Sequence, residues 1–233
     1  RTFSSAASDV YKRQLYNFNK QNLVDPEEMP ELERYLLTRI SILNEKLKEL
    51  VSKHDYHAIY TALLNFCTLE LSAFYFDIRK DSLYCDDIKS IKRRSTSTCL
   101  HIIFEFLTKW LSPIVSFTCE EAWKSRSYSN EESILLQNVK DDEFTYKDIS
   151  LEKVFEELKR VRKSVTSALE LKRNEKLIGS SLQAKVILFL SKDTQKIIAD
   201  LDLAEMCIVS NVETHDISNR SKESISIEDD EIY

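Results

Sequence analysis

Glycine is nearly absent from this chain of 233 residues, which contains one glycine and three prolines. Phosphate-binding loops, dinucleotide fingerprints and nucleophile elbows all need glycines where the backbone approaches a ligand or turns sharply. The single glycine, Gly179, cannot build any of these motifs. The composition therefore argues against a nucleotide site of these kinds, and we expect no catalytic residue in this chain.

Paired cysteines and long apolar runs are missing as well. The cysteines at positions 67, 85, 99, 119 and 207 form no C-x-x-C pair, which argues against a zinc ribbon and indicates reduced thiols. No run approaches the roughly 18 consecutive apolar residues that a membrane span needs, and no secretory leader opens the chain. We therefore expect a cytoplasmic protein with no membrane partner and no metal site.

The net charge of −6 is distributed unevenly. Residues 1–150 carry a net charge of −3, residues 151–185 carry nine basic and five acidic side chains, and residues 186–233 carry a net charge of −7. The basic segment is either a solvated helix face or a stripe that binds phosphates. Composition alone leaves both interpretations open.

Apolar residues recur at helical spacing through most of the chain, which predicts helices over about 26–50, 56–78, 90–111, 116–123 and 151–177. We expect Asp25 to cap the first helix, with regular structure beginning after Pro30, and Ser116 or Thr118 to cap the fourth. The second is apolar over most of its circumference, so we expect it to be the most buried. The fifth repeats apolar residues at Leu151, Val154, Leu158, Val161, Val165 and Ala168.

The pattern changes after Gly179, where residues 184–190 and 206–209 read as strands joined by a helix over about 194–200. The sequence thus predicts a mainly α fold, with a helical bundle over 15–177 and a small α+β subdomain over 178–233. The acidic end, 220–233, has a composition typical of poorly ordered segments. Residues 1–14 have no helical period, and we interpret them as a non-native or disordered leader.

Side chains that could suggest catalysis or metal binding have simpler explanations. His54 and His57 are three residues apart at a helix start with no third ligand nearby, so we expect capping and core roles. Cys119 has no histidine close in sequence, and four aspartates between positions 77 and 87 fit a helix end and turn. Trp110 and Trp123 favour packing in the bundle over stacking on bases.

Short segments stand in a fixed order at 15–18, 29–39, 57–67, 71–86, 93–95, 111–123 and 173–184. This series resembles the anticodon-binding region of isoleucyl-tRNA synthetases, which are class Ia aminoacyl-tRNA synthetases. Its last segment contains the junction around Gly179, which together with the segment at 71–86 favours the isoleucyl over the valyl and leucyl enzymes.

The chain departs from the family in two ways. Ser82 stands where the family usually carries an arginine, which weakens any phosphate contact at that turn. The resemblance also covers neither the nucleotide-binding fold, nor the editing domain, nor the C-terminal zinc ribbon. We therefore expect a fragment, truncated before that ribbon and inactive alone, with no cofactor of its own.

The resemblance implies that the intact enzyme ligates isoleucine to its tRNA, using ATP and a zinc ion bound elsewhere. The implied partners are isoleucine tRNA and the remainder of the synthetase chain, in a monomer. The alternatives are another class Ia synthetase, valyl or leucyl, and a non-enzymatic helical scaffold. Each basic residue near the matched segments could instead pair on a solvated helix face. The tRNA-binding residues that the resemblance implies are Lys80, Arg93, Arg94, Arg162, Arg173 and Lys176.

Overall fold

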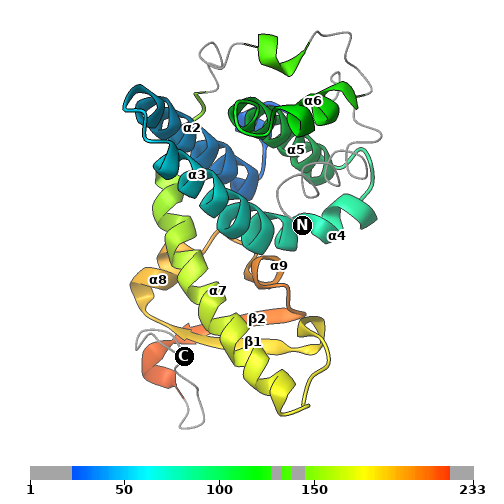
Figure 1. Cartoon of the computed structure of the whole chain (residues 1–233). Helices are drawn as coiled ribbons and strands as arrows, with labels where there is room; N and C mark the ends of the chain where they lie inside the picture. Colours follow the sequence, from blue (N-terminus) through cyan, green and yellow to red (C-terminus); the bar gives the residue numbers. More distant parts are fainter. Residues whose placement is uncertain (1–22, 127–132, 138–144, 221–233) are drawn as a thin grey trace. The chain divides into compact units, whose positions relative to one another are not determined.

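The computed structural model describes residues 23–126, 133–137 and 145–220, so the leader at 1–14 and most of the acidic end lie outside the described residues (Figure 1). Internal contacts divide the chain into two compact units, Arg1–Asp148 and Ile149–Tyr233. The described part of the first is helical, and that of the second combines helices with a two-stranded parallel sheet. The predicted fold class, mainly α with a small α+β part, is confirmed.

The unit boundary differs from the predicted one near residue 177. Helix α7 (Ser150–Asn174), expected as the fifth helix of the bundle, is grouped with the C-terminal unit. The reason is its buried face, which packs on two short helices of that unit, α8 (Lys192–Ile197) and α9 (Leu203–Cys207). The amphipathic stripe of α7 is real, but its partners follow it in the sequence.

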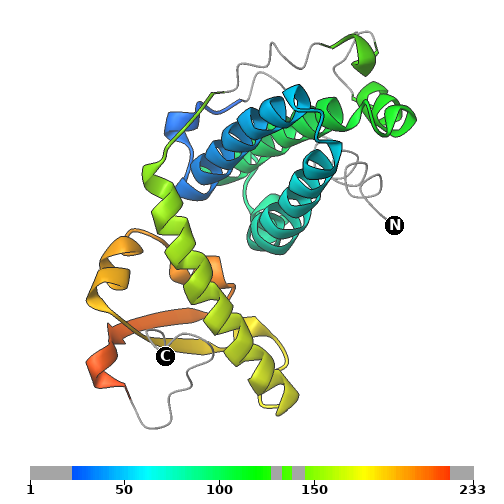
Figure 2. The ribbon, with the colours of Figure 1, turned by 60° about the vertical axis from the view of Figure 1, so that its left-hand side comes forward.

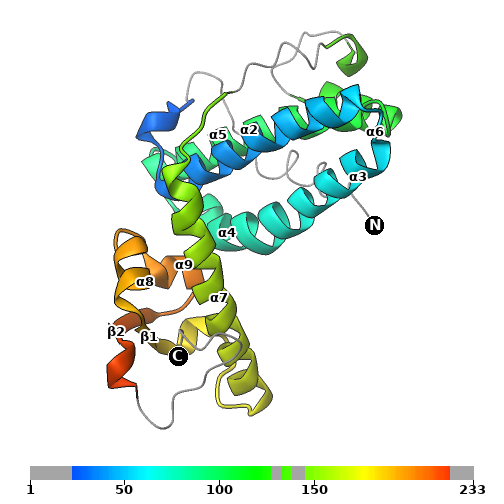
Figure 3. The same cartoon turned by 90° about the vertical axis from the view of Figure 1, so that its left-hand side faces the viewer.

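The first unit is built on two long helices, α2 (Glu31–Ser52) and α5 (Ile91–Leu111), which lie side by side (Figure 3). Helix α2 begins directly after Pro30, as expected, and a one-turn 3₁₀ helix (Pro26–Glu28) precedes it. The side chain of Asp25 makes no capping hydrogen bond there, contrary to the prediction. In α6 (Ser116–Lys124) the predicted cap is also wrong, because the Ser116 hydroxyl donates to the carbonyl of Ser112.

The most buried helix of the first unit is α5. Small hydroxyl residues on α5, such as Thr96 and Thr98, are buried and donate to carbonyls one turn back, which lets neighbouring helices approach closely. The prediction for the second helix is wrong, because α3 (Tyr56–Asn65) buries Ile59 and Leu63 but leaves Tyr60 exposed. The segment is therefore apolar on most sides without being buried on most sides.

The second predicted helix continues past residue 78. Helix α3, a π-helical segment (Phe66–Tyr75) and α4 (Phe76–Cys85) follow one another without interruption. By length and composition this segment could cross a membrane, but one such helix is weak evidence for a span. It also carries charged residues, among them the exposed Lys80 and the fully buried Arg79.

A buried ion pair joins three helices of the first unit. Glu33 on α2 accepts from Arg79 on α4 twice, at 2.7 Å from Nε and 2.8 Å from Nη2. The same carboxylate accepts from the Tyr75 hydroxyl at 3.2 Å and from the Thr96 hydroxyl of α5 at 3.3 Å. Burial, with the nearby Cys99 and Glu33, raises the pKa of Tyr75 well above its ordinary value. The bidentate geometry and the extra donors offset the desolvation of both charges.

The second unit holds two parallel strands, β1 (Lys185–Leu190) and β2 (Asn211–Asp216), connected through α8 and α9 (Figure 2). The first strand agrees with its prediction to one residue. The second prediction, 206–209, is wrong, because Met206 and Cys207 end helix α9 and the strand begins only at residue 211. On α7 the buried stripe includes Phe155 and Leu169, in place of the predicted Val154 and Ala168, which are half-buried.

Three helices end on residues in the left-handed conformation that glycine usually supplies. The residues are His54, Lys176 and Ile208, with φ of 57°, 59° and 57°. The end of α7 shows the full Schellman pattern, since Lys176 N donates to Arg173 O and Leu177 N to Lys172 O. The same pattern closes α2 and α9. The only glycine serves elsewhere, because Gly179 has no positive φ and donates its N–H to Gln183 Oε1 at 2.9 Å.

Candidate nucleic-acid interface

Three of the predicted cations come from the adjoining helices α4 and α5. Arg93 and Arg94 lie in the first turn of α5, where the Ser90 hydroxyl accepts from Arg93 N at 3.2 Å and caps the helix. The Arg93 guanidinium also donates from Nη1 to the carbonyl of Asp86 at 2.6 Å. This contact ties the start of α5 to the preceding loop. Arg93 and Arg94 are half-buried, whereas Lys80 on α4 is exposed.

Two of the predicted cations, the exposed Lys80 and the half-buried Arg173, pair with carboxylates on their own helices. Lys80 Nζ lies 3.0 Å from Asp77 Oδ1, and Arg173 pairs with Glu170 one turn back on α7. Such exposed pairs stabilise a helix by only about 0.2–0.5 kcal/mol. An approaching phosphate can therefore replace the carboxylate at little cost.

Arg162, one of the predicted tRNA-binding residues, is buried and does not lie on a solvent-facing edge of α7. Its residue is 8% exposed, and its guanidinium donates from Nη1 to the carbonyl of Met206 at the end of α9. The charge of Arg162 lowers the pKa of the adjacent Cys207 thiol, but burial outweighs it and raises that pKa to about 11. Arg162, Arg173 and Lys176 therefore do not form one exposed row along α7, also because α7 ends at Asn174.

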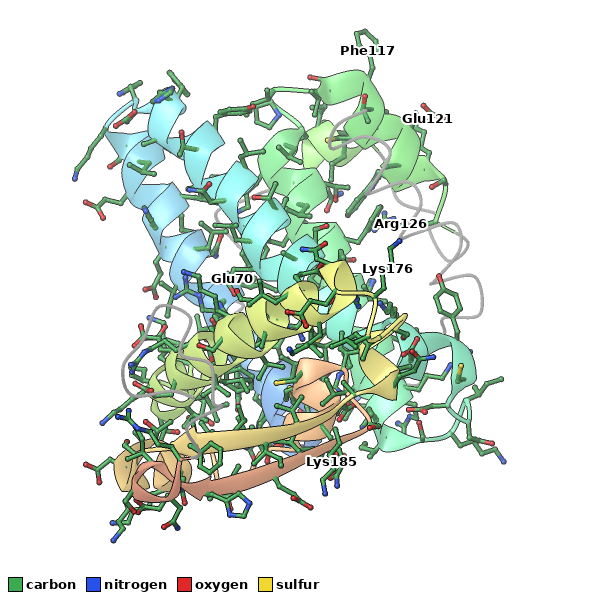
Figure 4. The ribbon with its side chains drawn as sticks, turned by 90° about the horizontal axis from the view of Figure 1, so that it is seen from below. Glu70, Phe117, Glu121, Arg126, Lys176 and Lys185 are labelled. Carbon is green, nitrogen blue, oxygen red and sulfur yellow. The ribbon has the colours of Figure 1, made fainter. Side chains whose placement is uncertain are left out.

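Two exposed cations of the second unit, Lys176 and Lys185, lie just after α7 and at the start of β1 (Figure 4). Lys176 is exposed on the left-handed turn after the helix. Lys185 at the start of β1 was not predicted as a site residue; its Nζ lies 2.6 Å from Glu213 Oε1 on β2 and lowers the pKa of that carboxyl. Between them, Ser180 and Gln183 form a capping box that orders the junction around Gly179.

The other reactive side chains take structural or solvent-facing positions. Burial raises the pKa of Cys119 to about 11, which disfavours the thiolate that a nucleophile needs. His54 and His57 are exposed, so their expected core role is wrong, and Asp55 caps α3 by accepting from Ala58 N at 3.0 Å. Within 23–126, 133–137 and 145–220, no three histidine, cysteine or acidic side chains are placed to hold a metal ion.

Both tryptophans pack within the first unit, as predicted. Trp123 is 1% exposed, and the guanidinium of the buried Arg126 lies 3.1 Å from its ring centroid (Figure 4). Trp110 is 9% exposed and donates from Nε1 to Asn44 Oδ1 at 2.9 Å. Arg126 is a cation that the sequence analysis did not single out, and its contacts are those of a structural residue.

A pocket of about 460 Å³ opens where α2 and α5 end and α3 begins. This pocket was not predicted, because its walls come from two segments, 48–59 and 109–114, that are far apart in the chain. The one available signal was the cluster of lysines and histidines around residues 46–57. The residues that line the pocket are Lys48, Val51, Tyr56, Ile59, Lys109, Trp110, Pro113 and Ile114.

Comparison with known proteins connects these elements to one family. The family model described as "Anticodon-binding domain of tRNA ligase" matches residues 33–188. Isoleucine–tRNA ligase of Pelagibacter ubique is 43% identical over 201 residues, which are 85% of this chain and 22% of that protein. The enzyme of the same name from Agrobacterium fabrum is 41% identical over 186 residues, or 79% of this chain and 19% of that protein. The chain thus spans about a fifth of the length of these relatives.

Proposed function

Because the chain belongs to the family of anticodon-binding domains of tRNA ligases, we propose that it binds the anticodon stem-loop of isoleucine tRNA. The observation that carries the proposal is the family match over residues 33–188, which spans the bundle and the junction into β1. The similarity to isoleucine–tRNA ligases supplies the choice of tRNA. Valyl and leucyl enzymes are the alternatives that the binding experiment below distinguishes.

Exposed and half-buried cations on both units make the contacts to the tRNA phosphates. In the first unit these are Lys80, Arg93 and Arg94, and in the second Arg173 and Lys176. Arginine and lysine supply affinity through phosphates, whereas unpaired bases supply identity. Arg162 has a structural role instead, since its guanidinium donates to the Met206 carbonyl and so connects α7 to the end of α9.

The longer protein to which such a domain belongs activates isoleucine with ATP and ligates it to tRNA in the cytoplasm, as a monomer. The chain itself lacks the glycine-rich elements that hold nucleotides, and ATP and zinc are bound by other parts of that protein. We therefore expect no isoleucine-dependent pyrophosphate exchange from the purified chain. Measurable exchange by a preparation free of host synthetase would contradict this part of the proposal.

The binding proposal is tested with the 233-residue chain and RNA hairpins that carry the anticodon arms of isoleucine, valine and leucine tRNAs. We expect the isoleucine hairpin to bind tightest, with an affinity that falls as salt rises. Equal affinity for the three hairpins would remove the assignment to isoleucine. No binding of any hairpin at low salt would overturn the proposed function.

Charge-neutral substitutions identify the phosphate contacts. Lys80→Gln, Arg94→Gln and Arg173→Gln should each reduce the slope of log affinity against log salt by roughly 0.7–0.9. Lys192→Gln is the matched control, because Lys192 is highly exposed on α8 and is not among the proposed phosphate contacts of either unit. A slope unchanged by all three substitutions would move the interface away from these residues.

A further inference from the structure

The pocket between α2, α3 and α5 has walls that are almost entirely apolar. The Trp110 ring forms part of the wall, and its only polar atom already donates to Asn44. Ile59 and Trp110 are buried, whereas Val51 and Ile114 at the opening are exposed. The volume of about 460 Å³ falls within the range of roughly 300–1,000 Å³ that small-ligand pockets have.

Tyr56 borders the opening with most of its ring in solvent. The side chain is 67% exposed and stands on the first turn of α3. His54 meets it edge to face, with ring centroids 6.4 Å apart. The left-handed turn at His54 and the Asp55 cap, which ends α2 and starts α3, fix the backbone beneath this ring. An aromatic ring held in solvent by an ordered turn is suited to stacking on a planar ligand.

The charged side chains that line the pocket are both lysines, Lys48 and Lys109. Lys48 is half-buried and Lys109 is 9% exposed, so their methylene stems complete the apolar wall. Their positive charges attract anions at the opening. This charge arrangement favours a ligand that is planar and apolar at one end and anionic at the other.

From this geometry we propose that the pocket receives one unstacked base of a bound RNA, with Tyr56 stacking on the base and Lys48 and Lys109 attracting the adjoining phosphates. The inference rests on the proposed function, because the RNA is the anticodon arm. Since the walls offer almost no hydrogen-bonding group to a base edge, the pocket holds a base without reading its identity. Discrimination between tRNAs then comes from other bases of the loop.

The pocket and the α4–α5 cations act as separate sites. Arg93 and Trp110 are both on α5 and are separated by 17 positions, which correspond to about 25 Å of helix. Substitutions at that separation are expected to add in free energy. Tyr56→Ala should therefore weaken RNA binding equally in the native chain and in the Arg94→Gln variant, without changing the salt dependence.

The experiment measures binding of the isoleucine anticodon hairpin to the full chain and to three variants. Tyr56→Ala should weaken binding roughly 5- to 150-fold, the range that loss of one base–aromatic stack covers. Tyr56→Phe keeps the ring and should bind as the native chain does. Tyr60→Ala is the matched control, because Tyr60 is exposed one turn further along α3 and does not line the pocket.

Abasic substitutions locate the base. Each loop nucleotide is replaced in turn by an abasic one, and at one position the native chain should lose affinity while Tyr56→Ala shows no further loss. Replacing that base by another base should cost far less than removing it. Lys48→Gln should lower the salt slope, whereas Lys46→Gln, exposed on the same helix, should leave it unchanged.

Two results would overturn the pocket proposal while leaving the proposed function intact. One is equal, small effects of Tyr56→Ala and Tyr60→Ala with tight hairpin binding. The other is a dimer, detected by light scattering, that Tyr56→Ala dissociates, since the pocket would then hold a second copy of the chain. If no hairpin binds, a single-stranded RNA pentamer distinguishes the pocket proposal from the proposed function. Pentamer binding that requires Tyr56 would support the pocket proposal alone, and no pentamer binding would overturn both proposals.

Discussion

Both units hold a buried arginine that joins helices, but the two arginines meet different partners. Arg79 in the first unit is 1% exposed and forms a bidentate pair with the carboxylate of Glu33. Arg162 in the second unit is 8% exposed and donates to a backbone carbonyl. Loss of Arg79 leaves the buried Glu33 carboxylate without its cation. Loss of Arg162 leaves only the neutral Met206 carbonyl without its donor. The contrast predicts different costs for the same substitution.

The largest effect is expected from Arg79→Met. The substitution leaves the carboxylate of Glu33 buried without its cation, and breaking a buried pair this way costs about 3–5 kcal/mol. Urea titration of the full chain should show this as a loss in the free energy of unfolding. Lys80→Met, at the exposed neighbouring position, should leave stability nearly unchanged.

The double variant Glu33→Leu with Arg79→Met tests whether the unpaired charge or the lost packing destabilises Arg79→Met. Removing both charges leaves no unpaired ion, so most of the lost stability should return. If the single and double variants were equally unstable, packing around Arg79 and not its charge would be responsible.

A smaller effect is expected from Arg162→Met. An unsatisfied buried carbonyl costs about 1–3 kcal/mol, and the loss should be confined to the second unit. Thiol labelling separates the units, because Cys207 belongs to the second and the buried Cys99 to the first. Cys207 should label faster in the variant at neutral pH, with Cys99 still protected.

The raised pKa of the Cys207 thiol determines how the free energy of unfolding changes with pH. Burial stabilises the neutral form, so the contribution to stability is fully present below the ordinary thiol pKa. It is lost as pH rises toward about 11.

Lys163→Met, at an exposed position on the same helix, is the control for Arg162→Met. Equal acceleration of Cys99 and Cys207 labelling would mean that the two units unfold together.

The sequence predicted most elements of both units but not their partners. Apolar spacing located α2, α5, α7 and β1 because these elements present a continuous stripe or run. It could not show that the segment over 56–78 keeps Tyr60 in solvent, or that α7 packs on helices that follow it. Basic composition likewise could not separate Arg162 from Arg173, since burial depends on which neighbour covers a helix face.

The scarcity of glycine explains two of the errors. Many helices are followed by a glycine in the left-handed conformation, but here that conformation falls on Lys176 after α7 and on Ile208 after α9. Without a stop signal, the predicted α7 ran on to residue 177. For the same reason, the apolar run 206–209 was interpreted as a strand, although a left-handed turn divides it.

The smallest effect is expected from placing glycine at these turns. Left-handed backbone costs a non-glycine residue about 1–2 kcal/mol, part of which is offset by the greater freedom of glycine in the unfolded chain. His54→Gly in the first unit and Lys176→Gly in the second should each stabilise the protein by roughly 0.5–1 kcal/mol. Gly179→Ala should be nearly neutral, because its added methyl group meets Gln183 Oε1 at an ordinary 3.4 Å. Destabilisation by both glycine substitutions in thermal melts would contradict the assigned backbone conformation.

If this chain holds the anticodon arm of isoleucine tRNA, as we propose, its affinity for the tRNA depends on that arm. A competition titration compares three RNAs: the whole tRNA, the tRNA without its anticodon arm, and the tRNA without its acceptor arm. Removing the acceptor arm should leave the affinity nearly unchanged, and removing the anticodon arm should abolish specific binding. Full affinity for the RNA that lacks the anticodon arm would contradict the proposal.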